Sequence, residues 1–311
     1  RRSRAAGTRV SNAVAPKAEP TEPLSHIADQ PLIGTVRATL VLAGFVALTL
    51  PLMPVQAILK RVAPSAARTF PHWYHKRVCG LMGIRIKIAG KIDRRQPTLY
   101  VSNHVSWLDI VVLSAVAPVS FVAKKEVSTW PGVSWLANLQ RTVFVDRERR
   151  QQIGRTAGEI SERLAAGDSI VLFAEGTSSD GNRVLPFRSS LFASALPKPK
   201  TQPDDALARS RSGASGPEVR QPIVRCIALT YTRLHGVALS RSQRSHIGWY
   251  GDMEMVDHAW ALLKSGPIDA VVAVGDAIPL GSETNRKTLA RDTEALIRRD
   301  VTAMLRTSGE E

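Results

Sequence analysis

A histidine and an aspartate stand in the sequence where they could act together as a proton-transfer pair. The segment NHVSWLD at 103–109 follows an apolar run and begins a helical pattern. The Asp109 carboxylate, inside the first helical turns, can fold back onto the His104 imidazole. Such a carboxylate fixes the tautomer and stabilises the imidazolium, so that the other ring nitrogen can take a proton from a hydroxyl group. The alternative for this pair alone is a capping histidine beside a surface aspartate.

A second group of polar residues also follows an apolar run. The segment FAEGTSS contains Glu175, Gly176 and Thr177, and the turn after it presents Arg183 and Arg188. A glycine permits close backbone approach, and a carboxylate with hydroxyl groups on a loop after a strand suits a polyol or phosphate-bearing substrate. The alternative for this segment is a polar turn without a function.

The third segment, VFVDR, ends another apolar run with charged residues. It contains Phe144, Asp146 and Arg147. Taken alone, this segment is no more than a strand that ends in a surface ion pair.

Several other kinds of site lack support in the sequence. Neither the P-loop pattern nor the GxGxxG pattern occurs, so nucleotide hydrolysis and dinucleotide cofactors are not expected. The GxSxG pattern of a serine hydrolase is also absent. His72 and His75 are near each other but have no third ligand nearby, so we expect no metal site.

These segments belong to a pattern in which apolar runs alternate with helical stretches. The alternation predicts an α/β layer fold with a largely buried, mostly parallel sheet, and in such sheets ligands bind where strands end. The predicted strands are Thr98–Ser102, Val119–Ala123, Thr142–Asp146, Ser169–Phe173, Pro222–Thr230 and Ala270–Val274, and the predicted helices are Trp107–Val116, Arg149–Ala166 and Thr284–Leu305.

The N-terminal part of the chain contains a long uncharged segment. Ala38–Leu59 has 22 residues without a charge, enough to cross a hydrocarbon core of about 30 Å as a helix. Pro51 and Pro54 interrupt its second half, so a kinked span and a re-entrant hairpin are both compatible with it. A cleaved signal sequence or a buried core helix is the alternative. We expect a membrane-associated element here.

The charge balance predicts an anionic partner. The 311 residues carry a formal net charge of +15, and residues 60–95 hold ten basic residues against one acid, Asp93. Basic residues after an apolar segment, with Trp73 and Tyr74 among them, favour an anionic membrane surface. A solvated basic helix face is the alternative. Nucleic acid is not expected, because no zinc-finger spacing or RNA-recognition motif accompanies the charge.

Composition also suggests how the chain is divided. We expect a disordered tail at 1–30, a membrane-associated apolar and basic region at 31–95, and an α/β domain at 96–311 with a mobile insertion at about 197–221. The two cysteines are too few for a disulfide framework, which is typical of a reducing compartment.

The motifs NHxxxxD, xVFVDR, FxEGTxS and QPIV, in this order, resemble the four sequence blocks of the glycerolipid acyltransferases. The best-known members of this family are the bacterial 1-acylglycerol-3-phosphate acyltransferases, and the resemblance covers roughly residues 75–235. It implies a mixed-sheet α/β domain anchored by an N-terminal helical segment. It also implies roles for the candidate residues: His104 as general base with Asp109 as its partner, Phe144, Asp146 and Arg147 for the acceptor head group, and Glu175, Gly176 and Thr177 for its glycerol or hydroxyl region.

Two residues depart from the family pattern in the third block. The usual sequence is FPEGTRS, whereas this chain has Ala174 and Ser178 in place of the proline and the arginine. That arginine is a natural phosphate ligand, because its forked cation makes bidentate contacts. In this respect the chain is similar to the branch that includes lyso-ornithine lipid acyltransferases. Arg183 or Arg188 could replace the missing cation.

The resemblance implies a membrane-associated acyltransferase that needs no cofactor beyond its co-substrate. The acyl donor would be acyl-CoA or acyl carrier protein, and the acceptor a lysolipid hydroxyl. Lysophosphatidate is the family's default acceptor, and lyso-ornithine lipid is the alternative. Because the site must share a compartment with acyl thioesters, we expect it at the cytoplasmic face of a bacterial inner membrane. The alternative from a different functional class is a non-catalytic basic protein that binds membranes.

Overall fold

The computed structural model describes residues 31–93, 96–145, 150–193, 223–279 and 284–307. The expected tail at 1–30 and the expected insertion at about 197–221 lie outside the described residues. Asp146 and Arg147 also lie outside them.

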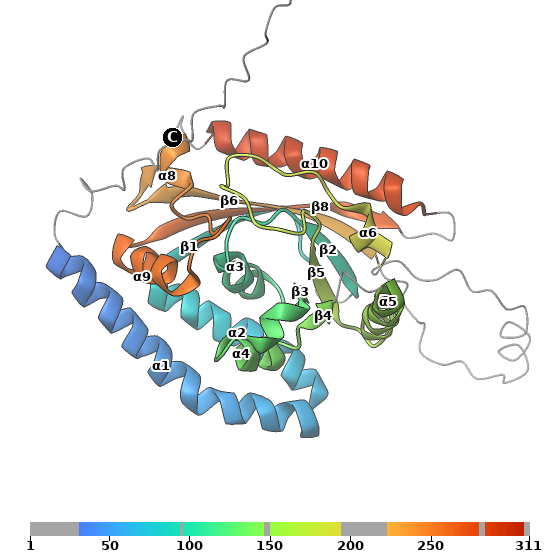
Figure 1. Cartoon of the computed structure of the whole chain (residues 1–311), viewed down its shortest axis with the longest axis horizontal. Coiled ribbons are helices and arrows are strands. Elements are labelled where there is room, and N and C mark those ends of the chain that lie inside the picture. The colour runs from blue at the N-terminus through green and yellow to red at the C-terminus, as the bar shows by residue number, and fades with distance from the viewer. Residues whose placement is uncertain (1–30, 94–95, 146–149, 194–222, 280–283, 308–311) are drawn as a thin grey trace, which may run out of the picture.

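A mixed sheet forms the centre of the described molecule (Figure 1). Its strand order is β1-β8-β6-β2-β5-β3-β4, with β7 paired to β6. All neighbours along this order are parallel except β6 and β8, which run antiparallel. The predicted α/β fold with a largely parallel sheet is therefore confirmed. The strands are β1 (Ile84–Ala89), β2 (Thr98–Ser102), β3 (Val119–Lys124), β4 (Val143–Val145), β5 (Ser169–Phe173), β6 (Ile223–Leu234), β7 (Val237–Ala238) and β8 (Ile268–Pro279).

Both faces of the sheet are covered by helices, because the central strands carry apolar side chains on both sides. On β6, Ile227 and Leu229 belong to one buried cluster, whereas Cys226 and Ala228 belong to the other. Figure 1 shows α10 above the sheet and α1, α2, α3 and α9 on its other side. The helices that form these layers are α1 (Pro31–Val62), α2 (Pro64–Met82), α3 (Leu108–Val116), α4 (Val133–Leu139), α5 (Arg150–Ala165), α6 (Ser189–Ala193), α9 (Met255–Ser265) and α10 (Arg286–Thr307).

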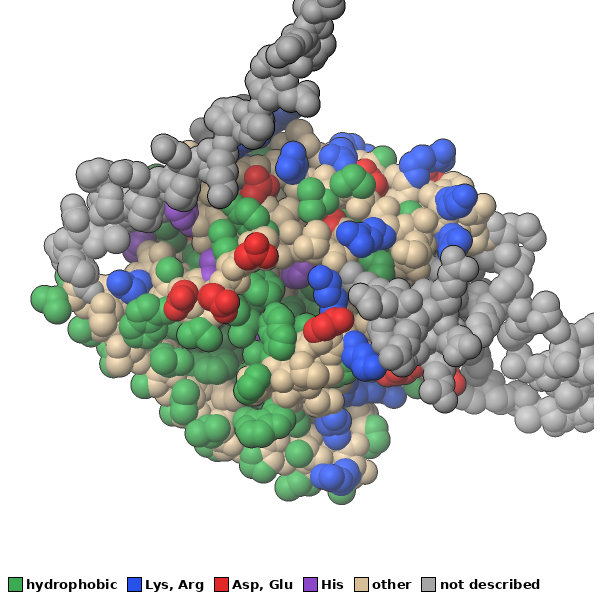
Figure 2. Space-filling view, in the orientation of Figure 1, with side chains coloured by type: hydrophobic (Ala, Val, Ile, Leu, Met, Phe, Trp, Pro, Cys, Tyr) green, Lys and Arg blue, Asp and Glu red, His purple; other side chains and the backbone are tan. Residues whose placement is uncertain are grey.

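The uncharged N-terminal segment forms one helix, not a hairpin. Helix α1 continues through Pro51 and Pro54. By length and composition, Leu32–Val62 could cross a membrane, with a mean hydropathy of 2.0 and only 17% of that window buried. Figure 2 shows hydrophobic side chains gathered where α1 lies in Figure 1. The large apolar side chains that α1 exposes are Leu32, Ile33, Val36, Leu40, Leu42, Val46, Leu50, Val55, Ile58 and Val62.

Helix α1 is attached to the rest of the domain near both of its ends. The Arg37 guanidinium donates hydrogen bonds to the carbonyls of Leu263, in α9, and Met82, in α2. Gln56 is buried and donates to the carbonyls of Ala67 at 3.0 Å and Leu139 at 2.9 Å. These contacts make α1 part of the folded domain.

The sequence pattern suggested that the α/β domain starts at residue 96. The sheet begins earlier in the chain, with strand β1. Strand β1 lies inside the basic region 60–95 and pairs with β8 in parallel. Its sequence IRIKIA alternates apolar and basic residues, which is the pattern of a strand with one buried face. Arg85 on its exposed side forms an ion pair with Asp269 at 2.6 Å. Part of the basic run therefore lies on the edge strand of the sheet.

Candidate active site

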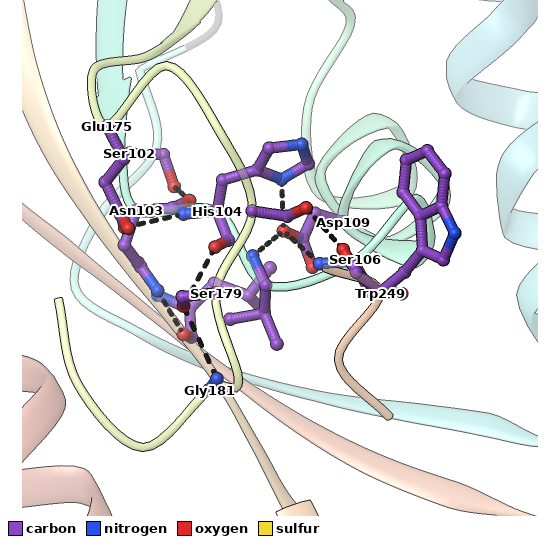
Figure 3. A network of polar contacts seen from close by, with 12 residues as sticks. Ser102, Asn103, His104, Ser106, Asp109, Glu175, Ser179, Gly181 and Trp249 are labelled. Atoms are coloured by element: carbon purple, nitrogen blue, oxygen red, sulfur yellow. Dashed lines mark hydrogen bonds and ion pairs between the residues drawn. The ribbon is translucent and has the colours of Figure 1, made fainter. Parts of the chain in front are cut away.

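The loop between β2 and α3 holds His104 against Asp109. Nδ1 of His104 lies 2.8 Å from Oδ2 of Asp109 (Figure 3). The same oxygen accepts hydrogen bonds from the backbone N–H groups of Val105 at 2.6 Å and Ser106 at 3.1 Å. Asp109 lies in the first turn of α3 and is fully buried. The short loop and the backbone donors therefore turn the carboxylate back toward the histidine, as the spacing predicted.

One face of the His104 imidazole packs on an aromatic ring. His104 and Phe173 are stacked, with 4.0 Å between their ring centroids and an angle of 14° between the planes. Phe173 in turn stacks on Phe121. The His104 side chain keeps 18% of its surface exposed. Because Nδ1–H donates to Asp109, the Nε2 atom carries the free lone pair, and no described residue hydrogen-bonds to it.

Asn103 holds this loop on the sheet. Its side-chain amide donates to the carbonyl of Leu229 at 2.9 Å, and its oxygen accepts from the N–H of Leu229 at 2.9 Å. Asn103 is itself buried. Asn103 begins the NHxxxxD motif and directly precedes His104, but the sequence does not reveal its role. Its two bonds fix the position of His104 relative to β6.

Glu175 connects the loop of His104 with the loop after β5. One carboxylate oxygen accepts from the N–H of His104 at 2.9 Å, and the other accepts from the N–H of Leu185 at 3.1 Å. Burial raises the pKa of Glu175 to about 8, and the charge of Asp109 adds to this effect, while the two backbone donors and Arg298 oppose it. The family resemblance implies that Glu175 binds the acceptor. Here both of its oxygens face backbone donors.

The residues after Glu175 brace the same loop. Gly176 has a φ of 75°, a conformation that favours glycine. The backbone N–H and hydroxyl of Ser179 donate to the carbonyl of His104 at 2.9 Å and 3.1 Å. Ser178 donates its hydroxyl to the carbonyl of Trp249, whose N–H donates to Val105. The Ser178 hydroxyl is therefore used in a hydrogen bond within the protein, and the side chain carries no charge for a ligand.

The other predicted site residues lie in different surroundings. Thr177, Arg183 and Arg188 are exposed, and neither arginine side chain has a polar partner in the described part of the chain. Phe144 is half-buried in β4, opposite Ala123 of β3. The structure thus brings together His104, Asp109, Glu175 and Gly176, whereas Phe144 lies three strands away from β2.

No group of three or more His, Cys, Asp or Glu side chains in the described ranges could hold a metal ion. The arrangement around His104 instead suits proton transfer. Nε2 faces partly open space, and the buried carboxylate is placed to stabilise the cation that forms when Nε2 takes a proton. A hydroxyl group placed at Nε2 would become a nucleophile.

The fold and the sequence both match known acyltransferases. The chain is 45% identical over 267 residues to a lyso-ornithine lipid O-acyltransferase of Brucella abortus, which covers 86% of this chain and 94% of that protein. It is 41% identical to a 1-acyl-sn-glycerol-3-phosphate acyltransferase of Neisseria gonorrhoeae over 98 residues, 32% of this chain and 38% of that protein.

A solved structure supports the same fold. The crystal structure of the 1-acyl-sn-glycerophosphate acyltransferase PlsC from Thermotoga maritima matches with a TM-score of 0.57 at 17% identity, over 89% of this chain and 97% of that one. The sequence pattern of the family described as Acyltransferase matches residues 83–200, which include His104, Asp109 and Glu175. Together with the relative matched over nearly its whole length, this shows that the chain belongs to the acyltransferase family and is an O-acyltransferase.

Proposed function

We propose that this enzyme transfers a fatty acyl group from a thioester to the free hydroxyl of lyso-ornithine lipid. The observation that carries the proposal is the His104–Asp109 pair, whose Nε2 atom is free of protein partners among the described residues. The acyl donor is acyl-CoA or acylated acyl carrier protein, either of which presents a thioester carbonyl to the site. The thiolate is a good leaving group, so the enzyme's main tasks are activation and positioning of the alcohol.

The reaction needs one proton acceptor. Nε2 of His104 takes the proton of the acceptor hydroxyl while the hydroxyl oxygen attacks the thioester carbonyl. Asp109, held by the backbone of Val105 and Ser106, stabilises the imidazolium. As the carbon–sulfur bond breaks, the imidazolium returns its proton to the departing thiolate. The products are the acylated lipid and a free thiol, and the histidine is neutral again.

Two observations favour the ornithine head group over a phosphate monoester. The likeness to the lyso-ornithine lipid O-acyltransferase spans 86% of this chain, whereas the likeness to the 1-acyl-sn-glycerol-3-phosphate acyltransferase spans 32%. In addition, the third block has Ser178, and its hydroxyl is bound to the Trp249 carbonyl. A doubly charged phosphate needs a cation there. A zwitterionic ornithine head group needs less compensation, and its amine would be repelled by an arginine.

The apolar face of α1 is the proposed membrane contact. Its exposed leucines and valines would enter the apolar layer, while its hydrogen bonds to α2, α4 and α9 keep the catalytic domain against the same surface. The basic residues that follow α1, such as Lys76 and Arg77, are suited to anionic head groups. We place the domain at the cytoplasmic face of the inner membrane, where acyl thioesters occur.

The test is acylation by the purified full chain. Acyl-CoA and acylated acyl carrier protein would each be combined with lyso-ornithine lipid and with lysophosphatidate, and the products measured by mass. We expect a higher kcat/KM with lyso-ornithine lipid. A preference for lysophosphatidate would overturn the acceptor assignment, and His104→Ala with unchanged turnover would overturn the mechanism. His246→Ala is the matched control, because that histidine is exposed.

A further inference from the structure

The two oxygens of the Asp109 carboxylate have different partners. Oδ2 accepts from His104 and from the backbone of Val105 and Ser106. Oδ1 accepts from the hydroxyl of Tyr231 at 2.7 Å, and no other described residue bonds to it. Tyr231 lies 122 residues further along the chain, and its side chain is 2% exposed. The orientation of the carboxylate thus depends on a distant strand as well as on its own loop.

Strand β6 presents Tyr231 to Asp109 for identifiable reasons. Tyr231 lies on the same face as Ile227 and Leu229, the face that packs with α3 in one buried cluster. The pairing of β6 with β8 is irregular between Tyr231 and Arg233, and such bulges redirect side chains. Two residues before Tyr231, the Asn103 side chain bonds both backbone groups of Leu229. The loop of His104 and the position of Tyr231 are therefore fixed on the same stretch of strand.

We propose that Tyr231 is a positioning residue for acyl transfer, which fixes the Asp109 carboxylate and through it the His104 imidazole. This inference rests on the proposed function of His104 as the base. A hydrogen bond to a charged group is stronger than one between neutral groups, and a buried carboxylate oxygen without a donor is unfavourable. Burial and the Asp109 charge raise the pKa of Tyr231 well above its ordinary value, so its hydroxyl keeps its proton and remains a donor at neutral pH.

Loss of the Tyr231 hydroxyl would have two consequences. The carboxylate could rotate, so the imidazole would be less well placed for the acceptor hydroxyl. Without the Tyr231 donor, the negative charge of Asp109 would also act more strongly on His104. This favours the imidazolium, so less of His104 would be available as a base at low pH. Two other ionisable groups act on this pair: Glu175 after β5, which bonds the His104 backbone and interacts with the Asp109 charge, and Cys79 from α2, which interacts with Tyr231.

The first test is Tyr231→Phe in the full-length enzyme. We expect kcat to fall about tenfold, the effect of one hydrogen bond to a charged group, with the lysolipid KM nearly unchanged. We also expect the acidic limb of the kcat/KM profile to move to higher pH. Tyr100→Phe is the matched control, since Tyr100 belongs to the same buried cluster but lines a cavity with Asp168 that Asp109 does not line. A variant with the wild-type rate and pH profile would overturn the proposal.

The second test separates positioning from stability. In the His104→Ala background, Tyr231→Phe should cause no further loss of residual activity, because residues that act as a unit are not additive. A further tenfold loss would show that Tyr231 acts elsewhere. Both comparisons use whichever lysolipid the wild type acylates, so a wrong acceptor assignment leaves them intact. Wild-type turnover in His104→Ala itself would instead refute the proposed function.

A third variant keeps the hydroxyl and the fold. Incorporation of 3-fluorotyrosine at position 231 makes the phenol a stronger donor, so the acidic limb should move to lower pH, opposite to the shift in Tyr231→Phe. Fluorotyrosine at position 100 is the control. An unchanged limb in the folded fluorotyrosine-231 enzyme would also contradict the proposal.

Discussion

At the residue scale, the pair of His104 and Asp109 should carry most of the rate. His104→Ala should lower kcat by about 10²–10⁴, the usual contribution of a positioned general base. Asp109→Asn should also impair turnover, because a neutral amide lacks the charge that stabilises the imidazolium and places an NH2 donor where one Asp109 oxygen now accepts. Steady-state kinetics and vesicle binding should both be measured. Normal turnover in the asparagine variant would show that Asp109 is only structural.

Glu175 gives a prediction about stability at the same scale. A carboxyl whose pKa is raised from 4.5 in the unfolded chain to about 8 in the folded one binds its proton more tightly when folded. Its contribution to stability is therefore lost as pH rises from about 4.5 to about 8. The free energy of unfolding should fall more steeply over this range in the wild type than in Glu175→Gln. Denaturant titrations at several pH values measure this, with exposed Glu254→Gln as control. Parallel curves for Glu175→Gln and the wild type would contradict it.

The contact between His104 and Asp109 was predictable from the sequence because the two residues are close in the chain. The contact between Asp109 and Tyr231 was not. Asp109 lies five positions after His104, in the first turn of a helix, so a short loop brings the two side chains within reach. Tyr231 reaches Asp109 across 122 residues, and nothing in a single sequence marks one tyrosine in an apolar strand as a donor. The role of Asn103 depends on the backbone of a distant strand and that of Glu175 on the backbone of other loops, which residue types do not reveal.

At the scale of elements, the bond between the β2–α3 loop and β6 should matter for both stability and rate. Asn103→Ala leaves the N–H and carbonyl of Leu229 without their side-chain partner in the core. We expect a loss of about 1–3 kcal/mol in the free energy of unfolding and a lower kcat. The control is Asn138→Ala, which removes an exposed bond within α4. Equal stability in both variants would show that the loop holds without Asn103.

Strands were easier to predict than the elements that carry positive charge. The predicted strands Thr98–Ser102 and Ser169–Phe173 coincide with β2 and β5, because buried parallel strands form continuous apolar runs. Strand β1 and helix α2 were not predicted, because their residues were assigned to the membrane-associated apolar and basic region 31–95. Their apolar positions are spaced among arginines and lysines, so the charge hides the periodicity. In the structure, the basic side chains on the outward faces of these elements are Lys76, Arg77, Arg85 and Lys87. Arg68 instead pairs with the buried Asp168 at 2.9 Å.

At the scale of the whole molecule, α1 has two sides with different tasks. Ala38 and Val41 are buried against the domain, whereas Leu40 and Leu50 are 66% and 62% exposed. Deletion of the helix would therefore damage the core together with the proposed membrane contact. Substitution on the exposed side alone separates the two effects. This distinction was not available from the sequence, where the whole segment is uncharged.

The double variant Leu40→Gln, Leu50→Gln should weaken membrane attachment and leave the fold intact. Burial of one leucine side chain contributes about 1.5–3 kcal/mol, so the pair should change partitioning about 100-fold or more. Sedimentation with vesicles at high salt measures this, and thermal unfolding checks the fold. Val237→Gln, on the exposed strand β7, is the control for a general loss of surface hydrophobicity. If the double variant stays with the vesicles at high salt, the contact lies on another surface. The expected release would show that α1 binds the membrane through its exposed side while its other side completes the enzyme.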